Sequence, residues 1–600
     1  MRSFLILLLL FFISYSNHSQ TVITDKRLKG LDTIVNRVLK DWHAPGVTIA
    51  VVEKNKVIFA GGFGYANYEK KVPVTANTLF AIGSCTKAFT AAMIGMLEKE
   101  GKLDIDKPVR NYLPELKFYN DYLNDHVTIR DMLCHRTGLP RHDLSWYGST
   151  ASRHELLERI QYQEPSAELR ERYQYNNFMF MSLGLVIEKI TGKSWEQNLQ
   201  ERILQPLNMS HTNLSVKDLA KTEDCSLAYT VDEKDSIKNI PYRNIDAIGP
   251  AGAINSCAND MANWLMTWIN TGKFQDKEII PSSFRNQAIS LQVSAGSSVP
   301  GQQNPDLYFN GYGFAWGMSS YRGHYRVEHS GGIDGFSTST SIFPSDSIGV
   351  FIVSDQDGPT TSIRNYIVDK MLGLPYRNWS NMQLDPILKA KKEFKRTNMD
   401  SMQQVPGTKP LHALADYAGN YENKGYGIVK IFIERDTAWI DYNEGGERTK
   451  TYLQHYHYDV FRLRSTEEKE DNGNAYKIKF NTDYDGHIES VEAKLEPSVK
   501  DIVFTKKAPE VDLSKKELEK YTGEYALSGV TVSVYIKNDN TLMVLVPGQP
   551  DYELVATGNH TFNLKVVPGY SVRFDMNEKN ESTAISFIQP NGTFKAEKKK

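Results

Sequence analysis

Cysteine is scarce in this sequence, and the spacings that usually bind metals are missing. The 600 residues include four cysteines, Cys85, Cys134, Cys225 and Cys257. No Cys-x-x-Cys or His-x-x-x-His pair occurs, so the sequence implies no metal site, and no cofactor is expected. If all four cysteines were oxidised they could pair in three ways. A chain of this length does not need disulfides for stability, and we expect Cys85 to be buried and unpaired.

A strong charge of either sign is also absent. The chain has 70 lysines and arginines against 72 aspartates and glutamates, for a formal net charge of −2. This balance gives no electrostatic reason to bind nucleic acid or an anionic membrane. Hydrophobic residues make up 40% and charged residues 24%, the composition of a soluble globular protein long enough for several domains.

Long apolar runs are missing everywhere except near the N-terminus. There, Arg2 precedes the apolar stretch 4–13, and small polar residues follow at 14–19. This order predicts a secretory signal peptide over residues 1–20, cleaved between residues 16 and 20. The alternative is an uncleaved anchor, although the apolar stretch is too short to span a bilayer. We expect an exported protein, periplasmic or secreted, without a stable membrane anchor.

The next part of the chain, residues 21–380, alternates between the two hydrophobic periods. Period-2 patterns predict strands near both ends of this part, and helical patterns dominate between them. The order of strands, helices and strands predicts an α+β domain, with one antiparallel sheet flanked by helices and a helical lobe inserted. The expected strands are 46–52, 57–63, 325–329, 338–343 and 348–353, and a final helix is expected at 362–371.

Beyond that domain the pattern changes to short alternating strands. Residues 381–410 are charged, then proline-containing, and are interpreted as a linker with a helix at 384–402. An internal repeat follows, because 414–421 (LADYAGNY) matches 518–525 (LEKYTGEY). Two consecutive units of this kind predict two small antiparallel β-barrels or sandwiches, at 411–508 and 509–600.

The stretch 80–97 carries the first candidate chemistry. Apolar residues recur at helical spacing after Ser84, and Lys87 lies one turn further along the same face. Burial on such a helix would lower the lysine pKa, so a neutral Lys87 could accept the Ser84 proton and activate it as a nucleophile. The alternative is that Ser84 simply caps the helix and Lys87 reaches solvent.

Two further stretches are expected to converge on Ser84. Tyr175 and Asn177 precede an apolar helix; a nearby ammonium would lower the Tyr175 pKa, so that Tyr175 could share the general-base role. Asn177 could donate to a substrate carbonyl or hold Lys87, although both residues could equally satisfy a helix start. His329 and the glycines after it end a strand. Backbone N–H groups of Ser84 and Gly332, with Gly331 as the alternative, could form an oxyanion hole.

Ser84-x-x-Lys87, Tyr175-x-Asn177 and His329-x-Gly331, in this order, resemble the motifs of the penicillin-recognising serine hydrolases over about residues 25–375. The most similar branch is related to class C β-lactamases and includes D-aminopeptidases, D-alanyl-D-alanine carboxypeptidases and secreted esterases. The resemblance implies a β-lactamase/transpeptidase-like domain. D-Aminopeptidases of this family also carry two C-terminal β-barrels, and a barrel loop reaches their active site.

The sequence departs from the β-lactamases at His329, where they carry a lysine. Histidine is mostly neutral near pH 7, so an anchor for the penicillin carboxylate is missing. The resemblance therefore implies an acyl-enzyme hydrolase of small amides or esters, such as D-amino-acid or peptidoglycan-derived peptides. In this interpretation Ser84, Lys87 and Tyr175 are catalytic, and Asn177, His329, Gly331 and Gly332 bind substrate. The alternatives are a β-lactamase, or a weakly catalytic penicillin-binding or cell-wall-binding protein.

Overall fold

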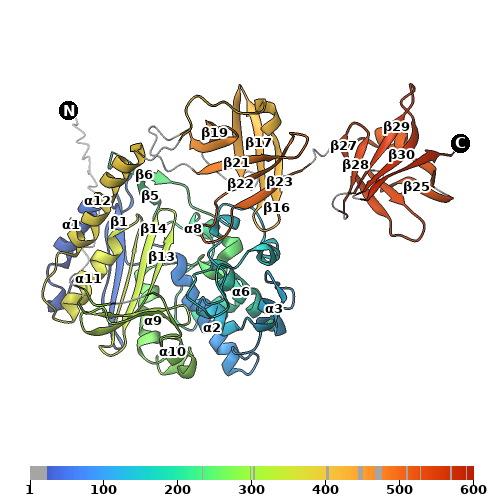
Figure 1. Ribbon diagram of the computed structural model, residues 1–600. Helices are drawn as coiled ribbons and strands as arrows, with labels where there is room; N and C mark the ends of the chain where they lie inside the picture. Colours follow the sequence, from blue (N-terminus) through green and yellow to red (C-terminus); the bar gives the residue numbers. More distant parts are fainter. Residues whose placement is uncertain are drawn as a thin grey trace, which may run out of the picture.

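The computed structural model shows three bodies in chain order, an N-terminal domain and two β-barrels (Figure 1). It describes residues 23–599 apart from gaps at 233, 297–298, 302–304, 401–403, 443–450, 467–475, 508–510, 528, 539, 566, 568–569 and 590. The predicted signal peptide therefore lies outside the described residues. Among those described, no helix is both long and apolar enough to cross a bilayer.

The N-terminal domain is built on a nine-stranded sheet in the order β10-β11-β12-β13-β14-β15-β1-β2-β3. Every neighbouring pair is antiparallel, and β1 joins the two ends of the domain by pairing with β15, Val47 opposite Ser354. The prediction of one sheet made from both ends is confirmed. The strands are β1 (Gly46–Glu53), β2 (Lys56–Asn67), β3 (Val72–Pro73), β10 (Val293–Ser294), β11 (Asn310–Tyr312), β12 (Gly317–Tyr321), β13 (His324–Ile333), β14 (Phe336–Phe343) and β15 (Ile348–Ser354).

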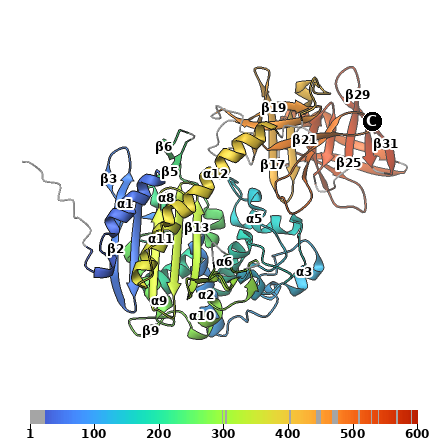
Figure 2. The same cartoon turned by 60° about the vertical axis from the view of Figure 1, so that its left-hand side comes forward.

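Helices cover both faces of this sheet, as Figure 2 shows. On one face α1 (Leu31–Asp41) and α11 (Pro359–Met371) pack against inward side chains of β1 and β15, forming one apolar cluster. On the other face α9 (Ala258–Ile269) and α2 (Lys87–Lys99) join the larger cluster of the helical lobe. The lobe contains α3 (Asp121–His126), α4 (Ile129–Leu133), α5 (Arg153–Arg159), α6 (Asn177–Thr191), α7 (Trp195–Leu199), α8 (Val216–Leu219) and α10 (Ser282–Ala288).

The final helix of the domain begins three residues earlier than predicted. Pro359 occupies its first turn, where the missing N–H costs nothing because first-turn N–H groups have no helical partner. The helix expected at 384–402 is part of α12 (Trp379–Asp400), which starts against the N-terminal domain with a buried Trp379. It leads towards the first barrel in Figure 2.

The repeat corresponds to two closed eight-stranded antiparallel barrels. In each one a tyrosine hydroxyl donates to the carbonyl four residues earlier, Tyr421 to Tyr417 and Tyr525 to Tyr521, both at 2.8 Å. The first barrel contains β16 (Gly419–Asn423), β17 (Gly427–Glu434), β18 (Thr437–Tyr442), β19 (Thr451–His457), β20 (Val460–Ser465), β21 (Lys477–Thr482), β22 (Ile488–Ala493) and β23 (Ile502–Lys506). The second contains β24 (Gly523–Leu527), β25 (Val530–Lys537), β26 (Thr541–Leu545), β27 (Tyr552–Gly558), β28 (Thr561–Leu564), β29 (Ser571–Met576), β30 (Ser582–Gln589) and β31 (Gly592–Lys598).

Candidate active site

Ser84 lies in a 3-10 turn, Gly83–Thr86, that continues directly into α2. The expectation that Ser84 opens a helix holds, with this turn placed before the regular helix. Gly83 has φ of 52°, a left-handed conformation that glycine adopts without strain. A Cβ at this position would also come 2.8 Å from the Gly332 nitrogen. The turn and the end of β13 therefore approach each other as closely as backbone allows.

Lys87 is fully buried, and its amine contacts three oxygens. The Nζ atom lies 3.0 Å from Ser84 Oγ and donates to Asn177 Oδ1 and the Ala251 carbonyl, both at 2.7 Å. Burial holds the Lys87 pKa well below its usual value, and the positive charge of Arg141 lowers it further. A neutral amine has two N–H groups, which the two carbonyl oxygens accept. Its lone pair is then left for the Ser84 proton.

Tyr175 contacts the same hydroxyl from the other side. Its Oη donates to Ser84 Oγ at 2.7 Å. The prediction that the Tyr175 pKa falls is wrong, because burial raises the pKa and the hydrogen bond with Ser84 offsets only part of this rise. Lys87 does little to lower the Tyr175 pKa, because burial favours the neutral form of its amine, which supplies no cation. The geometry therefore makes Lys87 the proton acceptor and Tyr175 a protonated phenol that donates.

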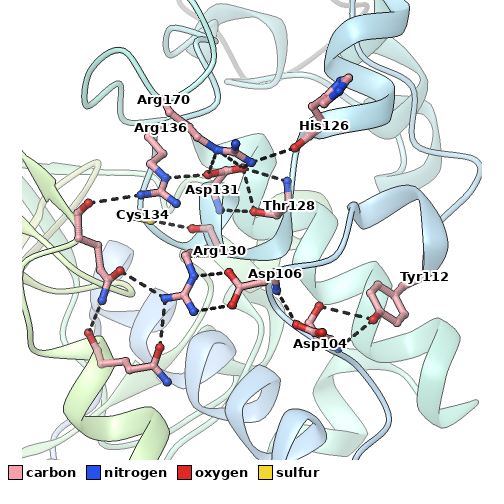
Figure 3. Close-up of polar contacts among 12 residues, drawn as sticks. Asp104, Asp106, Tyr112, His126, Thr128, Arg130, Asp131, Cys134, Arg136 and Arg170 are labelled. Atoms are coloured by element: carbon pink, nitrogen blue, oxygen red, sulfur yellow. Dashed lines mark hydrogen bonds and ion pairs between the residues drawn. The ribbon is translucent and has the colours of Figure 1, made fainter.

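A charge network around one buried carboxylate holds the chain just before Tyr175; its ion pairs are drawn in Figure 3. Asp131 on α4 is fully buried and accepts from Arg136 at 2.6 Å and Arg170 at 2.9 Å. Figure 3 shows the two arginines meeting at this carboxylate. Backbone bonds then join the segments, with Gln174 N–H donating to the His135 carbonyl at 2.7 Å. The centres of the His135 and Tyr175 rings lie 4.4 Å apart, so His135 packs against the Tyr175 ring and helps to hold it in place.

Asn177 begins α6, after Asn176, whose side chain caps the helix. Besides accepting from Lys87, Asn177 donates through Nδ2 to Asp143 Oδ1 at 2.9 Å. The structure thus brings Ser84, Lys87, Tyr175 and Asn177 together. Asn177 orients the amine, which is one of the two contacts that the sequence suggested for it.

His329 lies behind Tyr175, with the ring centres 6.2 Å apart. Its Nε2 lies 2.8 Å from the Tyr312 hydroxyl and its Nδ1 lies 2.6 Å from the Ser330 carbonyl, so both ring nitrogens have protein partners. Burial lowers its pKa to about 4, so the ring is neutral near pH 7. The substrate-binding role of His329 stays a prediction. Because both ring nitrogens already have protein partners, His329 would act on substrate indirectly, by holding its neighbours in place.

The two glycines after His329 differ in their surroundings. A Cβ on Gly331 would come 2.0 Å from the Ile82 carbonyl oxygen, so Gly331 allows β13 to lie against the Ser84 turn. Gly332 has open space on its Cβ side and lines the cleft beside Ser84. This favours Gly332 over Gly331 as the second oxyanion donor, and the assignment itself stays a prediction.

The cleft around Ser84 has a volume of about 340 Å³. Sequence reasoning missed part of its wall, including four residues of the segment 141–147 and two acidic residues, Asp334 and Asp357. No local pattern within this segment marks it as functional. The lining residues are Gly83, Ser84, Arg141, Asp143, Trp146, Tyr147, Asn177, Ile245, Ile248, Ala251, Gly252, Gly332, Ile333, Asp334 and Asp357.

All four cysteines are unpaired, and Cys85 is buried as predicted, with its thiol donating to the His329 carbonyl at 3.2 Å. One group with metal-ligand chemistry, His211, Cys257 and Asp260, lies away from the cleft. Its carboxylate already accepts the backbone N–H groups of His211 and Thr212. These hydrogen bonds tie residues 211–212 to the first turn of α9, which is a structural role for Asp260.

Comparison with known proteins agrees with this geometry. The family model Beta-lactamase matches residues 31–369, and a domain of unknown function, DUF3471, matches residues 403–506. The chain is 30% identical over 434 residues to the unguisins hydrolase ungD of Aspergillus violaceofuscus, covering 67% of this chain and 76% of that protein. It is 26% identical to protein flp of Staphylococcus aureus, over 56% of this chain and 64% of that protein.

Among solved structures, the octameric penicillin-binding protein homologue from Pyrococcus abyssi superposes with a TM-score of 0.52 at 22% identity. The match covers 79% of this chain and 99% of that one, which supports the fold. The family match spans more than half of the chain and contains every residue that contacts Ser84 in the structure. This protein belongs to the Beta-lactamase family and is one of its serine hydrolases.

Proposed function

We propose that the protein is an exported hydrolase that cleaves small amides or esters, above all D-amino-acid peptides, through an acyl-enzyme on Ser84. The observation that supports this proposal most directly is that two side chains, Lys87 and Tyr175, contact the Ser84 hydroxyl oxygen. Ser84 Oγ lies 3.0 Å from a buried lysine amine and 2.7 Å from a tyrosine hydroxyl. An amine with a lowered pKa beside a hydroxyl is the arrangement that activates a nucleophile.

The proton transfers follow from which groups are neutral. As Ser84 Oγ bonds to the substrate carbonyl carbon, its proton passes to the lone pair of Lys87. The bond to the leaving nitrogen or oxygen then breaks, and the leaving group takes a proton from Lys87 through the Tyr175 phenol, which contacts the same Oγ. Water repeats the steps to release the acid. The backbone N–H groups of Ser84 and Gly332 would hold the carbonyl oxygen as it becomes negative.

The charges of the cleft support an amine-bearing substrate. Its wall carries three carboxylates, Asp143, Asp334 and Asp357. Arg141 is bound to Asp143 and Arg243 to Asp334, so among the described residues Asp357 is the carboxylate without an arginine partner. Partial desolvation of Asp357, with the charge of Asp334 nearby, raises the Asp357 pKa. Such an environment favours an ammonium group and opposes a carboxylate. With His329 neutral, the carboxylate of a β-lactam gains no cation from this strand.

Export and a cell-wall source of substrate rest on the sequence. The apolar stretch 4–13 after Arg2 supports secretion. Peptides derived from peptidoglycan carry D-amino acids, and a protein outside the cytoplasm would meet them. A relative named as a hydrolase supports amide or ester chemistry in this family.

The first test is covalent labelling. Wild-type protein should react with a fluorophosphonate probe, and Ser84→Ala should lose the label completely. Ser514→Ala is the matched control, because this serine caps a short helix in the second barrel. Undiminished labelling of Ser84→Ala would overturn the assignment.

The second test separates the candidate substrates. Rates are compared on D-amino-acid p-nitroanilides, p-nitrophenyl esters and nitrocefin. We expect the D-anilides with a free amino group to exceed their N-acetylated forms by at least tenfold, and nitrocefin to be the poorest substrate. A preference for nitrocefin would establish a β-lactamase, and labelling without turnover would establish a binding protein.

A further inference from the structure

The segment 141–147, which sequence reasoning missed, has two faces. Arg141, Asp143, Trp146 and Tyr147 line the catalytic cleft. The three residues interleaved with them, His142, Leu144 and Ser145, turn to the first barrel instead. Because both sets belong to seven consecutive residues, whatever holds one face also fixes the other.

His142 makes the main contact with the barrel and is almost fully buried. Its backbone N–H donates to Glu496 Oε2 at 3.0 Å, and its ring Nδ1 lies 2.7 Å from the Tyr426 hydroxyl. The other ring nitrogen lies 3.0 Å from the Glu164 carbonyl in the N-terminal domain. Tyr426 and Glu496 are also buried, so water cannot replace either partner at this junction.

Two neighbours of His142 add contacts of their own. Ser145 donates through Oγ to the Gly425 carbonyl at 2.6 Å, and the Leu144 carbonyl accepts from the Tyr442 hydroxyl at 2.7 Å. The Leu144 side chain packs against the apolar core of the first barrel. The barrel thus holds the segment by side chains and by backbone.

The backbone of His142 needs such support. Its φ of 47° and ψ of 31° place it in the left-handed region, which non-glycine residues rarely occupy. Conformations of this kind persist only where surrounding contacts determine them. Here the partners that fix the peptide and the ring of His142 include two residues of the barrel.

The cleft face of the segment connects to the catalytic amine. Asp143 Oδ1 accepts from Asn177 Nδ2 at 2.9 Å, and Asn177 in turn accepts from Lys87. Asp143 also accepts from the Trp146 indole at 2.8 Å, and the Arg141 guanidinium lies 4.8 Å from the centre of the Tyr175 ring. A displaced segment would therefore release Asn177 and open the space around Lys87.

We propose that the first barrel is a positioning element of the active site, acting through Tyr426 and Glu496 on His142 and so on Asp143, Asn177 and Lys87. Among the described residues the barrel contributes none to the lining of the cleft. It acts from behind the segment, unlike the barrel loop that enters the active site in the D-aminopeptidases. The proposal assigns a role to the region that matches a domain of unknown function, and it presupposes Ser84 as the nucleophile.

The test removes single hydrogen bonds and leaves the barrel packing intact. Tyr426→Phe and Glu496→Met remove the two polar partners that the barrel offers His142, and Ser145→Ala breaks one bond from the other side. Methionine is chosen because a glutamine would keep an oxygen able to accept from the His142 N–H. Tyr421→Phe is the matched control, because it deletes an equally buried hydroxyl whose partner lies within the barrel. The rate of Ser84 labelling by the fluorophosphonate is measured against pH, alongside thermal unfolding.

We expect Tyr426→Phe and Glu496→Met to slow labelling about tenfold and Ser145→Ala about threefold. Water reaching Lys87 would restore part of its pKa, so the acidic limb of the pH profile should move to higher pH. Tyr421→Phe should lower the melting temperature and leave both the rate and the limb unchanged.

A different result would overturn the role of the barrel. If the three junction variants match Tyr421→Phe in rate and in pH profile, the contacts are purely structural. This failure is distinct from a failure of the proposed function, in which the wild-type protein itself would not label or would label without Ser84.

Discussion

The two barrels share one internal design and differ in their attachment to the rest of the chain. Each has a buried tyrosine, Tyr421 or Tyr525, bonded to the carbonyl four residues earlier, and a lysine on the last strand, Lys506 or Lys598, near that tyrosine ring. Yet the hydrogen bonds from a barrel to the N-terminal domain, among the described residues, all come from the first barrel. In Figure 1 the second barrel lies apart from that domain.

The difference lies in the connections between strands. In the first barrel, residues 424–426 separate β16 from β17, and residues 494–501 separate β22 from β23. These two connections supply Gly425, Tyr426 and Glu496. In the second barrel the corresponding strands are closer in sequence, since β24 ends at Leu527 before Val530 and β30 ends at Gln589 before Gly592. The repeat thus preserves the core, and the longer connections supply most of the contacts with the segment 141–147.

The largest expected effect concerns the pH dependence of labelling. Lys87 must be neutral to accept the Ser84 proton, and its lowered pKa makes this form available at neutral pH. Below that pKa the labelling rate should fall about tenfold per pH unit as the amine becomes charged. Stopped-flow labelling across pH measures this limb.

The acidic limb of this pH profile also tests whether the two barrels differ in their effect on Lys87. A surface change in the second barrel, Glu597→Gln, should leave it in place, because that barrel has no described contact with the N-terminal domain. A limb displaced by Glu597→Gln would show that both barrels act on Lys87 and would remove the contrast between them.

The next effect comes from making the first barrel resemble the second. Replacing residues 494–501 by the two-residue connection Pro-Asn found at 590–591 removes Glu496 and the bond to the His142 N–H. We expect labelling of Ser84 to slow about tenfold to thirtyfold, with the barrel still folded by circular dichroism. Lengthening the 590–591 connection by the same residues is the control and should have no effect on labelling.

The smallest effect on activity comes from the shared tyrosines. Tyr421→Phe deletes one buried hydrogen bond and should lower the free energy of unfolding by about 1 kcal/mol. Tyr525→Phe deletes the matching bond and also a contact with the Ser582 hydroxyl, so its loss should be the larger. Urea unfolding measures the loss, and labelling should stay within twofold of wild type for both. A larger loss for Tyr421→Phe than for Tyr525→Phe would show that the two cores are less alike than their repeat indicates.

Much of this molecule could be predicted from sequence, because the signals were local. Ser84 and Lys87 lie one turn apart on an apolar helix, and Tyr175 and Asn177 lie together before another. The barrels repeat the motif at 414–421 and 518–525. In each case the residues that matter are close in the chain and carry the periodicity of their element.

The rest required contacts between distant residues. His142 meets Tyr426 and Glu496 across most of the chain, and no spacing within 141–147 indicates this. The pKa of Tyr175 was predicted in the wrong direction for a related reason. The sequence shows a lysine nearby, but only the fold shows that burial lowers the pKa of this lysine and raises the pKa of the phenol.

The junction between the first barrel and the segment 141–147 relies heavily on main-chain oxygens. The carbonyls of Leu144, Gly425 and Glu164 are acceptors there. A carbonyl survives any substitution at its own position, so these bonds can outlast extensive divergence of the side chains. Relatives could therefore keep the same coupling without an alignment revealing it, and a barrel exchanged between them would retain function only if its loop geometry came with it.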